Sequence, residues 1–153
     1  MEIQLIIFGL YLFLAVFLAG NMTTLQFQHY GIYHFVARDN FKNYMAANNK
    51  SALVPSILPA LILLITNIVL IFFRPDFFSL AEVLFCFALN LVALISTFVW
   101  QRKLQSQMAL EGYNDNKINK LISTNYIRTI IFLIQAIIAI TIVLNALSKI
   151  KSR

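Results

Sequence analysis

The hydrophobic positions of this chain gather into four long runs, which cover residues 3–24, 52–73, 78–100 and 126–147. Within these runs the apolar residues follow one another without the alternation that a half-buried strand shows. Each run has about the 20 residues that an α-helix needs to cross the hydrocarbon core of a bilayer. The pattern predicts an all-α fold, in which residues 1–153 form one integral membrane bundle of four transmembrane helices.

The first run has two interpretations. A cleavable signal peptide would have a similar length, and Leu18-Ala19-Gly20 resembles a cleavage site. However, the residues before the run include Glu2 and no lysine or arginine, whereas signal peptides begin with positive charge. We therefore expect this run to be retained as the first transmembrane helix.

The second and third runs are joined by the short sequence Arg74-Pro75-Asp76. So short a connection predicts that these two helices are antiparallel neighbours. Pro55 and Pro59 lie near the start of the second run. Proline removes a backbone hydrogen bond and bends a helix. We expect a kink there, with neighbouring groups bonding the carbonyls that the prolines leave free.

Two polar segments, residues 25–51 and 101–125, lie on the same side of the membrane if all four runs cross it. We expect them to form a helical and aromatic cap. In the first segment, a polar connection leads to a helix from Phe41 onward, which Asp39 or Asn40 can cap. One face of that helix carries Phe41, Tyr44, Met45 and Asn48.

In the second polar segment, the helical pattern of the third run continues beyond Trp100 through Gln101, Leu104 and Met108. Gly112 is a suitable C-cap for that helix. The last helix is expected to begin at Asn114 or Asp115, because both side chains cap helices well.

Cationic residues predict the orientation. With Arg128 left aside, the cap side carries seven of them and the opposite side four; these are Arg38, Lys42, Lys50, Arg102, Lys103, Lys117 and Lys120, against Arg74, Lys149, Lys151 and Arg153. The positive-inside rule then places the cap in the cytoplasm.

Composition agrees with a membrane location. The chain is 60% hydrophobic, against about 45–50% for a soluble domain, and its mean hydropathy is +0.78. The net charge of +6 is expected at the headgroup level, in contact with anionic lipid. No basic run is longer than two residues, which argues against nucleic-acid binding. Cys86 is the only cysteine, so the chain can form no internal disulfide.

Polar residues inside the runs are candidates for function, because polar groups in hydrocarbon are costly. Glu82, near the start of the third run, lies at the interface, takes part in a proton or ion path, or forms a hydrogen bond to another helix. Asn67, Asn90 and Gln135 either bond across helices or line a polar pocket for a small ligand. Glu82 and Asn90 fall on one small and polar face together with Cys86, Ala93 and Thr97.

Arg128 stands where the last run meets the cap. Its guanidinium either extends to the headgroups or points inward and holds an anionic group or a carbonyl. In the second case its ligand-binding neighbours are expected to be Asn125 on its own helix and Tyr30, Tyr33 and His34 from the first polar segment.

No metal or cofactor site is predicted. His29 and His34 are five residues apart, whereas a helical metal pair needs a separation of three or four. The chain contains no HExxH, CxxC or GxSxG motif, and no set of residues implies a redox cofactor.

The segment Leu121–Thr129 (LISTNYIRT), which follows Leu110-Glu111-Gly112, resembles a pattern in small four-helix bacterial membrane proteins of unknown function. The anthrone-oxygenase-like group is similar. The stretch Tyr30-Gly-Ile-Tyr33, followed by Phe41 and Tyr44, resembles the first loop of the same proteins. The resemblance implies a four-helix fold in a bacterial inner membrane and a cap-side site near Tyr30, Tyr44, Asn125 and Arg128.

The chain departs from that pattern at five positions. Tyr126 stands where tryptophan is usual and Gly31 where proline is usual, and Met45, Asn48 and Met108 stand where many relatives have histidine. If those histidines serve metal binding or proton transfer in the relatives, this chain lacks that chemistry.

Three functions follow from these observations. The first is a small accessory subunit or a binder of lipid or a lipophilic small molecule, with lipid and other membrane proteins as partners. The second is an oxygenase-like membrane enzyme on a lipophilic substrate, in which Arg128 with His34 or a tyrosine polarises the substrate. The third is an oligomeric transporter or proton path through Glu82 and the amides.

Overall fold

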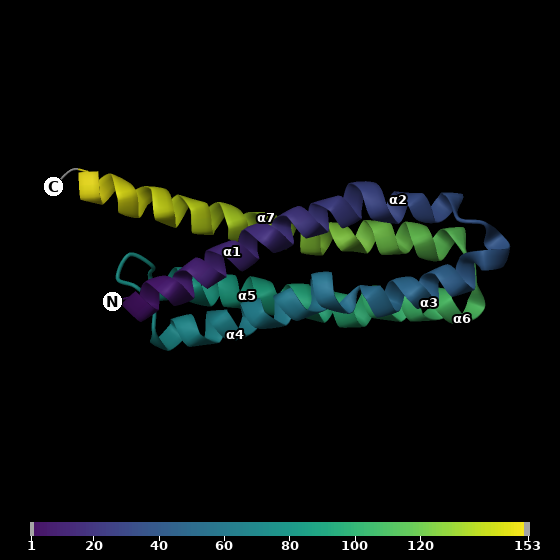
Figure 1. Cartoon of the computed structure of the whole chain (residues 1–153), viewed down its shortest axis with the longest axis horizontal. Helices are drawn as coiled ribbons and strands as arrows, with labels where there is room; N and C mark the ends of the chain where they lie inside the picture. Colours follow the sequence, from purple (N-terminus) through teal and green to yellow (C-terminus); the bar gives the residue numbers. More distant parts are fainter. Residues whose placement is uncertain (1, 152–153) are drawn as a thin grey trace.

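The computed structural model describes residues 2–151, and all regular structure in that range is helical. The chain forms four long helical rods, which lie side by side in an elongated bundle (Figure 1). Arg153, counted above among the cations opposite the cap, lies outside the described residues. The rods consist of α1 (Glu2–Thr24), η1 (Leu25–His29), α2 (Tyr30–Ile32) and η2 (Tyr33–Phe35); η3 (Arg38–Asn40), α3 (Phe41–Ser51), η4 (Leu53–Ile57) and α4 (Leu58–Phe72); α5 (Leu80–Ser96), η5 (Thr97–Arg102) and α6 (Lys103–Glu111); and α7 (Asp115–Lys151).

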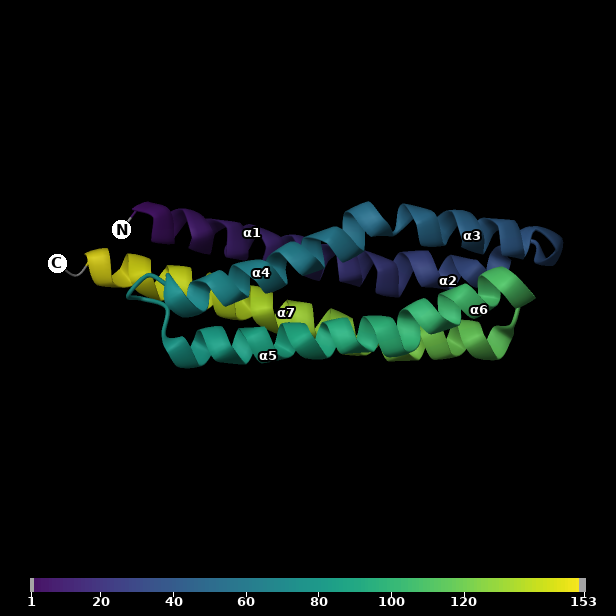
Figure 2. The same ribbon diagram turned by 90° about the horizontal axis from the view of Figure 1, so that it is seen from below.

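The rods run up, down, up and down, which is the topology of an antiparallel four-helix bundle. The described ends of the chain lie together at one end of the bundle, and α3 and α6 lie at the other (Figures 1 and 2). Helices α1 and α5 each pack against both α4 and α7, and α3 packs against α6. The predicted all-α bundle is confirmed, as is the antiparallel pairing of α4 with α5.

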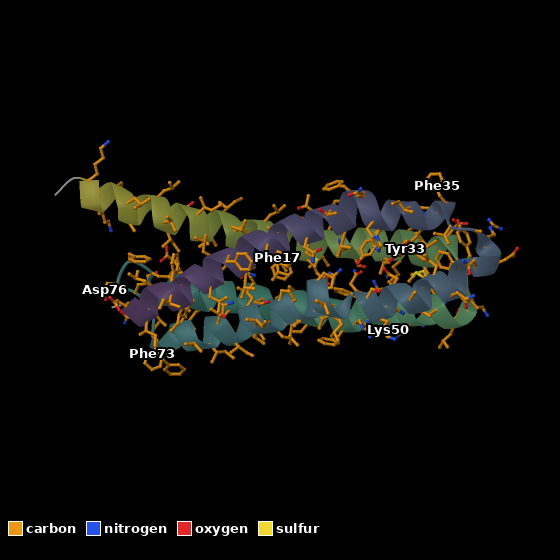
Figure 3. All side chains as sticks on the ribbon, viewed as in Figure 1. Phe17, Tyr33, Phe35, Lys50, Phe73 and Asp76 are labelled. Atoms are coloured by element: carbon orange, nitrogen blue, oxygen red, sulfur yellow. The ribbon has the colours of Figure 1, made fainter. Side chains whose placement is uncertain are left out.

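The half that holds the chain ends is apolar outside as well as inside. Each of the four rods contains a helix long and apolar enough to cross a membrane. Large side chains such as Ile6, Phe13, Ile65 and Ile137 are about two-thirds exposed. Exposed apolar surface on this scale is typical of contact with lipid. Phe73 and Asp76 mark the far end of this membrane half, opposite Lys50 and Phe35 (Figure 3).

The cap half has a core of its own, formed by aromatic and sulfur-containing side chains that include Tyr33, Phe41, Met45 and Met108. The sequence interpretation was wrong about residues 25–35, which were expected to be a polar connection. They continue the first helix, and only Val36 and Ala37 interrupt the helical path before η3. No proline breaks this stretch, and burial of Gln26, Tyr30 and Tyr33 gives it an inward face.

Local sequence signals set the other helix ends. Gly112 ends α6 with φ of +98°, a conformation that residues with a Cβ rarely adopt. Asn114 Oδ1 accepts a hydrogen bond of 3.0 Å from the Lys117 backbone N–H at the start of α7. Both ends are as predicted. At the start of α3, by contrast, the Asn40 side chain makes no capping bond.

Glu82 lies in the first turn of α5, where it forms a capping box with Ser79. Its Oε2 accepts from the Ser79 backbone N–H at 2.9 Å and from the Ser79 hydroxyl at 2.6 Å. A capping box satisfies two backbone donors that the helix end leaves free. Glu82 therefore belongs to the helix end and not to the polar face inside the bundle.

Candidate functional site

Three of the four rods contain a π-helical segment, and all three segments lie where the membrane half meets the cap. They are η1, η4 and η5, whereas α7 is uninterrupted. Each π-helical turn is wider than an α-turn and accommodates about one extra residue, and such segments are frequent at functional sites. Widening at the same level in three neighbouring rods opens space between them.

The prolines explain the segment in the second rod. Pro59 has no N–H, so the Pro55 carbonyl, four residues earlier, loses its helical donor. The Asn21 side chain of α1 replaces that donor, with Nδ2 2.7 Å from the Pro55 oxygen and 3.1 Å from the Ser56 hydroxyl. The predicted hydrogen bond from a neighbouring helix to a carbonyl that the prolines leave free is confirmed.

The space between the rods is a pocket of about 210 Å³. Its wall combines polar and cationic side chains with apolar ones, and no aspartate or glutamate takes part. The lining residues are Asn21, Leu25, His29, Tyr30, Asn48, Ser51, Ala52, Pro55, Ser56, Ile57, Thr97, Gln101, Arg102, Gln105 and Arg128.

Arg128 points inward and reaches this pocket from α7. The residue is 6% exposed. Its Nε donates to Asn125 Oδ1 at 2.9 Å, Nη1 donates to the Thr97 hydroxyl at 3.3 Å, and Nη2 donates to the Tyr30 hydroxyl at 3.1 Å and to Asn125 Oδ1. A guanidinium has five N–H donors in a fixed fork. One hydrogen on Nη1 therefore has no acceptor within the described chain.

All of these acceptors are neutral. The two salt bridges found in the described residues, His34 with Asp115 and Lys117 with Glu111, both lie in the cap. Burying a charge without a counter-charge costs several kcal/mol. The site thus combines a buried cation, an adjoining cavity and a free N–H, and an anion in the cavity would offset that cost.

A second hydrogen-bonded layer fixes Asn125, which is fully buried. Its Nδ2 donates to Gln26 Oε1 at 2.9 Å and to the Thr129 hydroxyl at 3.3 Å. The Thr129 hydroxyl lies 3.3 Å from the Met22 carbonyl. Because Nδ2 is held in this way, Oδ1 must face Arg128, and the guanidinium is held in its orientation before any ligand binds.

His29 supplies a second polar group at the pocket. Its Nε2 lies 2.9 Å from Asn48 Oδ1 and 3.3 Å from the Tyr33 hydroxyl, and Asn48 Nδ2 donates to that hydroxyl at 2.8 Å. His29 and Asn48 line the pocket, whereas Tyr33 stands behind them.

The structure brings three of the six predicted ligand-binding residues together, Tyr30, Asn125 and Arg128. Tyr33 does not line the pocket, but its hydroxyl contacts His29 and Asn48, which do. His34 and Tyr44 were wrongly placed: His34 bonds Asp115 at the cap surface, and Tyr44 packs on Tyr33 and Phe41. The first helix runs on through residue 35, and this turns His29, not His34, toward the pocket.

The amides Asn67, Asn90 and Gln135 are fully buried, as expected of an inward face. Within the described chain their side-chain atoms have no hydrogen-bond partner. The bonds between Gln101 and Thr124 and between Arg128 and Thr97 fix the antiparallel register of α5 and α7. Seven residues farther from the cap, or about 10 Å, that register places Asn90 opposite Gln135.

Sequence reasoning missed several lining residues for which a signal existed. Thr97, Gln101 and Gln105 recur every four residues, and they continue the polar face of the third run into the cap. Arg102 was counted only as a cap cation. Asn21 stands one helical turn before Leu25, where nothing in the sequence indicates that a proline carbonyl lies opposite.

Among residues 2–151, no three His, Cys, Asp or Glu side chains are grouped closely enough to hold a metal ion.

The Tyr113 hydroxyl donates to Asp115 Oδ1 at 2.6 Å in the cap. This bond raises the pKa of Tyr113.

Fold and site together define the class: a four-helix bundle with membrane-length apolar helices and a buried arginine at a pocket between its two halves. Comparison of the chain with family models, with curated proteins and with solved structures gives no match.

Proposed function

We propose that this protein binds an anionic ligand in the pocket beside Arg128. One observation carries the proposal: Arg128 is 6% exposed, and its guanidinium contacts only neutral acceptors and borders a cavity of about 210 Å³. Arg102 lines the same cavity and adds a second positive charge. The site therefore has positive charge without negative charge, together with oriented donors for an oxyanion.

The location of the pocket favours a ligand from the membrane, such as the headgroup of an anionic lipid. A protein of this size that binds such a ligand would suit the role of an accessory subunit, with lipid and other membrane proteins as partners. We propose a bacterial inner membrane as its location. The cationic excess on the cap side supports a cytoplasmic cap.

The test is binding of dodecyl phosphate to the protein in phosphatidylcholine nanodiscs, measured by native mass spectrometry. Dodecanol serves as the uncharged probe. We expect saturable binding of dodecyl phosphate and none of dodecanol. Arg128→Gln should weaken binding by at least about tenfold, because loss of a buried charge contact costs about 2–5 kcal/mol.

Arg74→Gln is the matched control. Arg74 donates to the Ile71 carbonyl at the opposite end of the bundle and takes no part in the pocket. Arg128→Lys keeps the charge but not the fork, and its affinity should fall between those of the wild type and Arg128→Gln. Equal affinity of the wild type and a folded Arg128→Gln variant would overturn the proposal.

A further inference from the structure

We infer that the ligand of this pocket is a single-chain amphiphile: its oxyanion head lies beside Arg128, and its apolar chain leaves between η4 and η5 into the bilayer. The inference rests on the proposed function and adds the chemical class of the ligand and its path. Three features of the molecule support it.

The first feature is the level of the pocket. Its lining residues cluster where the four apolar runs end on the cap side: Leu25 in the first rod, Ile57 in the second, Thr97 in the third and Arg128 in the fourth. These run ends mark the expected boundary between hydrocarbon and headgroups. An amphiphile in the membrane carries its charged head at this depth without being lifted out of the bilayer.

The second feature is a crevice directly below the pocket, on the side toward the membrane core. Pocket and crevice share Ser56, Ile57, Thr97 and Arg128. Otherwise the crevice is lined only by apolar side chains, namely Met22, Ala60, Ala93, Leu94, Phe98 and Phe132. Polar groups thus surround Arg128 on the cap side and apolar groups on the other, which matches the two ends of an amphiphile.

The third feature is the way out of the crevice. Met22, Ala60, Ala93 and Phe132 form its buried inner wall, whereas Phe98 is 58% exposed on the outer face of η5. Ile57 of η4 and Leu94 at the end of α5 are partly buried at the opening. The crevice is narrow, with only about 20 Å³ of free space. So narrow a crevice admits one alkyl chain but not the two chains of a phospholipid. Most of that alkyl chain then lies in the bilayer, beyond the crevice.

The charges and the donors describe the head. Arg102 Nη1 lies 3.4 Å from the Asn49 carbonyl, and its remaining donors are available to the cavity. The N–H groups that Arg128 and Arg102 leave free, together with the amides of Asn48 and Gln105, provide more donors than a carboxylate accepts. A phosphate monoester uses this set most fully.

Photo-crosslinking tests the path. The probe is dodecyl phosphate with a diazirine near its head, bound to the protein in phosphatidylcholine nanodiscs, and crosslinked peptides are mapped by mass spectrometry. We expect crosslinks at residues 57–60 and 94–98, enriched at least fivefold over those of the uncharged diazirine dodecanol. Ala60→Leu fills the crevice and should reduce these crosslinks at least threefold; Ala81→Leu, on an exposed face of α5, should not.

The outcomes separate the two proposals. Crosslinks that depend on Arg128 but map to residues 48–52 or to Gln105 would overturn the path and leave anion binding in place. Displacement of the probe by an equal concentration of inorganic phosphate would also overturn the path and leave anion binding in place, because the alkyl chain of the probe would then contribute nothing to its affinity. Crosslinks that do not depend on Arg128 would overturn both. If Ala60→Leu does not fold, Phe98→Ala tests the opening without adding volume.

Discussion

At the scale of single residues, the contact between Asn21 and Pro55 shows how the bundle tolerates proline in an apolar helix. Pro59 leaves the Pro55 carbonyl without its helical donor, and the side chain of Asn21 supplies one from the neighbouring helix at 2.7 Å. Inside a membrane, water cannot replace such a donor. The Asn21 amide therefore compensates for the missing N–H of Pro59, which lies 38 residues away in the chain.

This contact predicts a specific pattern of stability. Asn21→Ala should lower the free energy of unfolding by about 0.5–1.5 kcal/mol, because the Pro55 carbonyl loses the hydrogen bond from Asn21. In a Pro59→Ala background the same change should cost less, because the substituted residue has a backbone N–H that can donate to the Pro55 carbonyl. Unfolding in mixed micelles, followed by circular dichroism, measures the free energy of unfolding of the wild type, the two single variants and the double variant.

Asn43→Ala, which removes an exposed amide in the cap, is the matched control and should change stability little. An equal cost of Asn21→Ala in both backgrounds would show that the carbonyl of Pro55 is not what Asn21 satisfies.

The residues around Arg128 show what a sequence can and cannot predict. Asn125 and Arg128 are three residues apart at the end of an apolar run, so helical periodicity alone places them side by side. The pairing of Tyr30 with Arg128 followed from the resemblance and the expected cap. The inward turn of His29 could not be predicted, because it depends on the helical path of residues 25–35, and polar composition had suggested a connection there.

At the scale of helices, the three π-helical segments are what make a pocket in an otherwise close-packed bundle. Regular α-helices would bring small and medium side chains into contact at this level, as they do around Ala139, which is fully buried. A widened turn moves the following side chains outward. Only the proline-linked segment has a local sequence cause; η1 and η5 contain no proline.

Removing one residue from η5 should therefore close the pocket without unfolding the protein. Deletion of Phe98, an exposed residue, is expected to convert the wide turn to a regular one and keep the faces of α5 and α6. Helical content should stay the same, and binding of dodecyl phosphate should weaken at least about tenfold.

Deletion of Val92, which is also exposed but lies in the regular helix α5, is the control. It rotates everything beyond it by about 100° and should prevent folding. Equal behaviour of the two deletions would contradict the role given to η5.

The facing amides of α5 and α7 lead to a prediction about energy. Asn90 and Gln135 are fully buried with no partner in the described chain, and such groups cost about 1–3 kcal/mol each. The double substitution Asn90→Leu with Gln135→Met puts apolar side chains of similar size in their place and should raise the free energy of unfolding, measured as above. A loss of more than about 1 kcal/mol would mean that the amides are satisfied, by each other or by trapped water.

At the scale of the whole molecule, the up-down-up-down course puts both connections of the cap at one end and the α4–α5 connection at the other. The apolar half has lipid-type surface on all sides, whereas the cap has its own aromatic core. If the four rods cross a bilayer, residues 43 and 116 must lie on one side and residue 76 on the other.

Cysteine labelling tests this arrangement. In a Cys86→Ala background, Asn43→Cys and Asn116→Cys should react alike with a membrane-impermeant maleimide, and Asp76→Cys should react only from the opposite side; all three positions are exposed. Sealed cells and inverted vesicles give the two accessible sides. Labelling of Asp76→Cys and Asn43→Cys from the same side would rule out four crossings.

The π-helical segments also affect how this chain must be compared with others. Each corresponds to one extra residue within a helix. A related protein without one of these segments would align with this chain only if a single-residue gap were placed at residues 25–29, 53–57 or 97–102. Since gaps are usually confined to loops, an alignment without them would shift the cap by one position. It would then pair His29, Gln101 and Arg102 with the wrong residues.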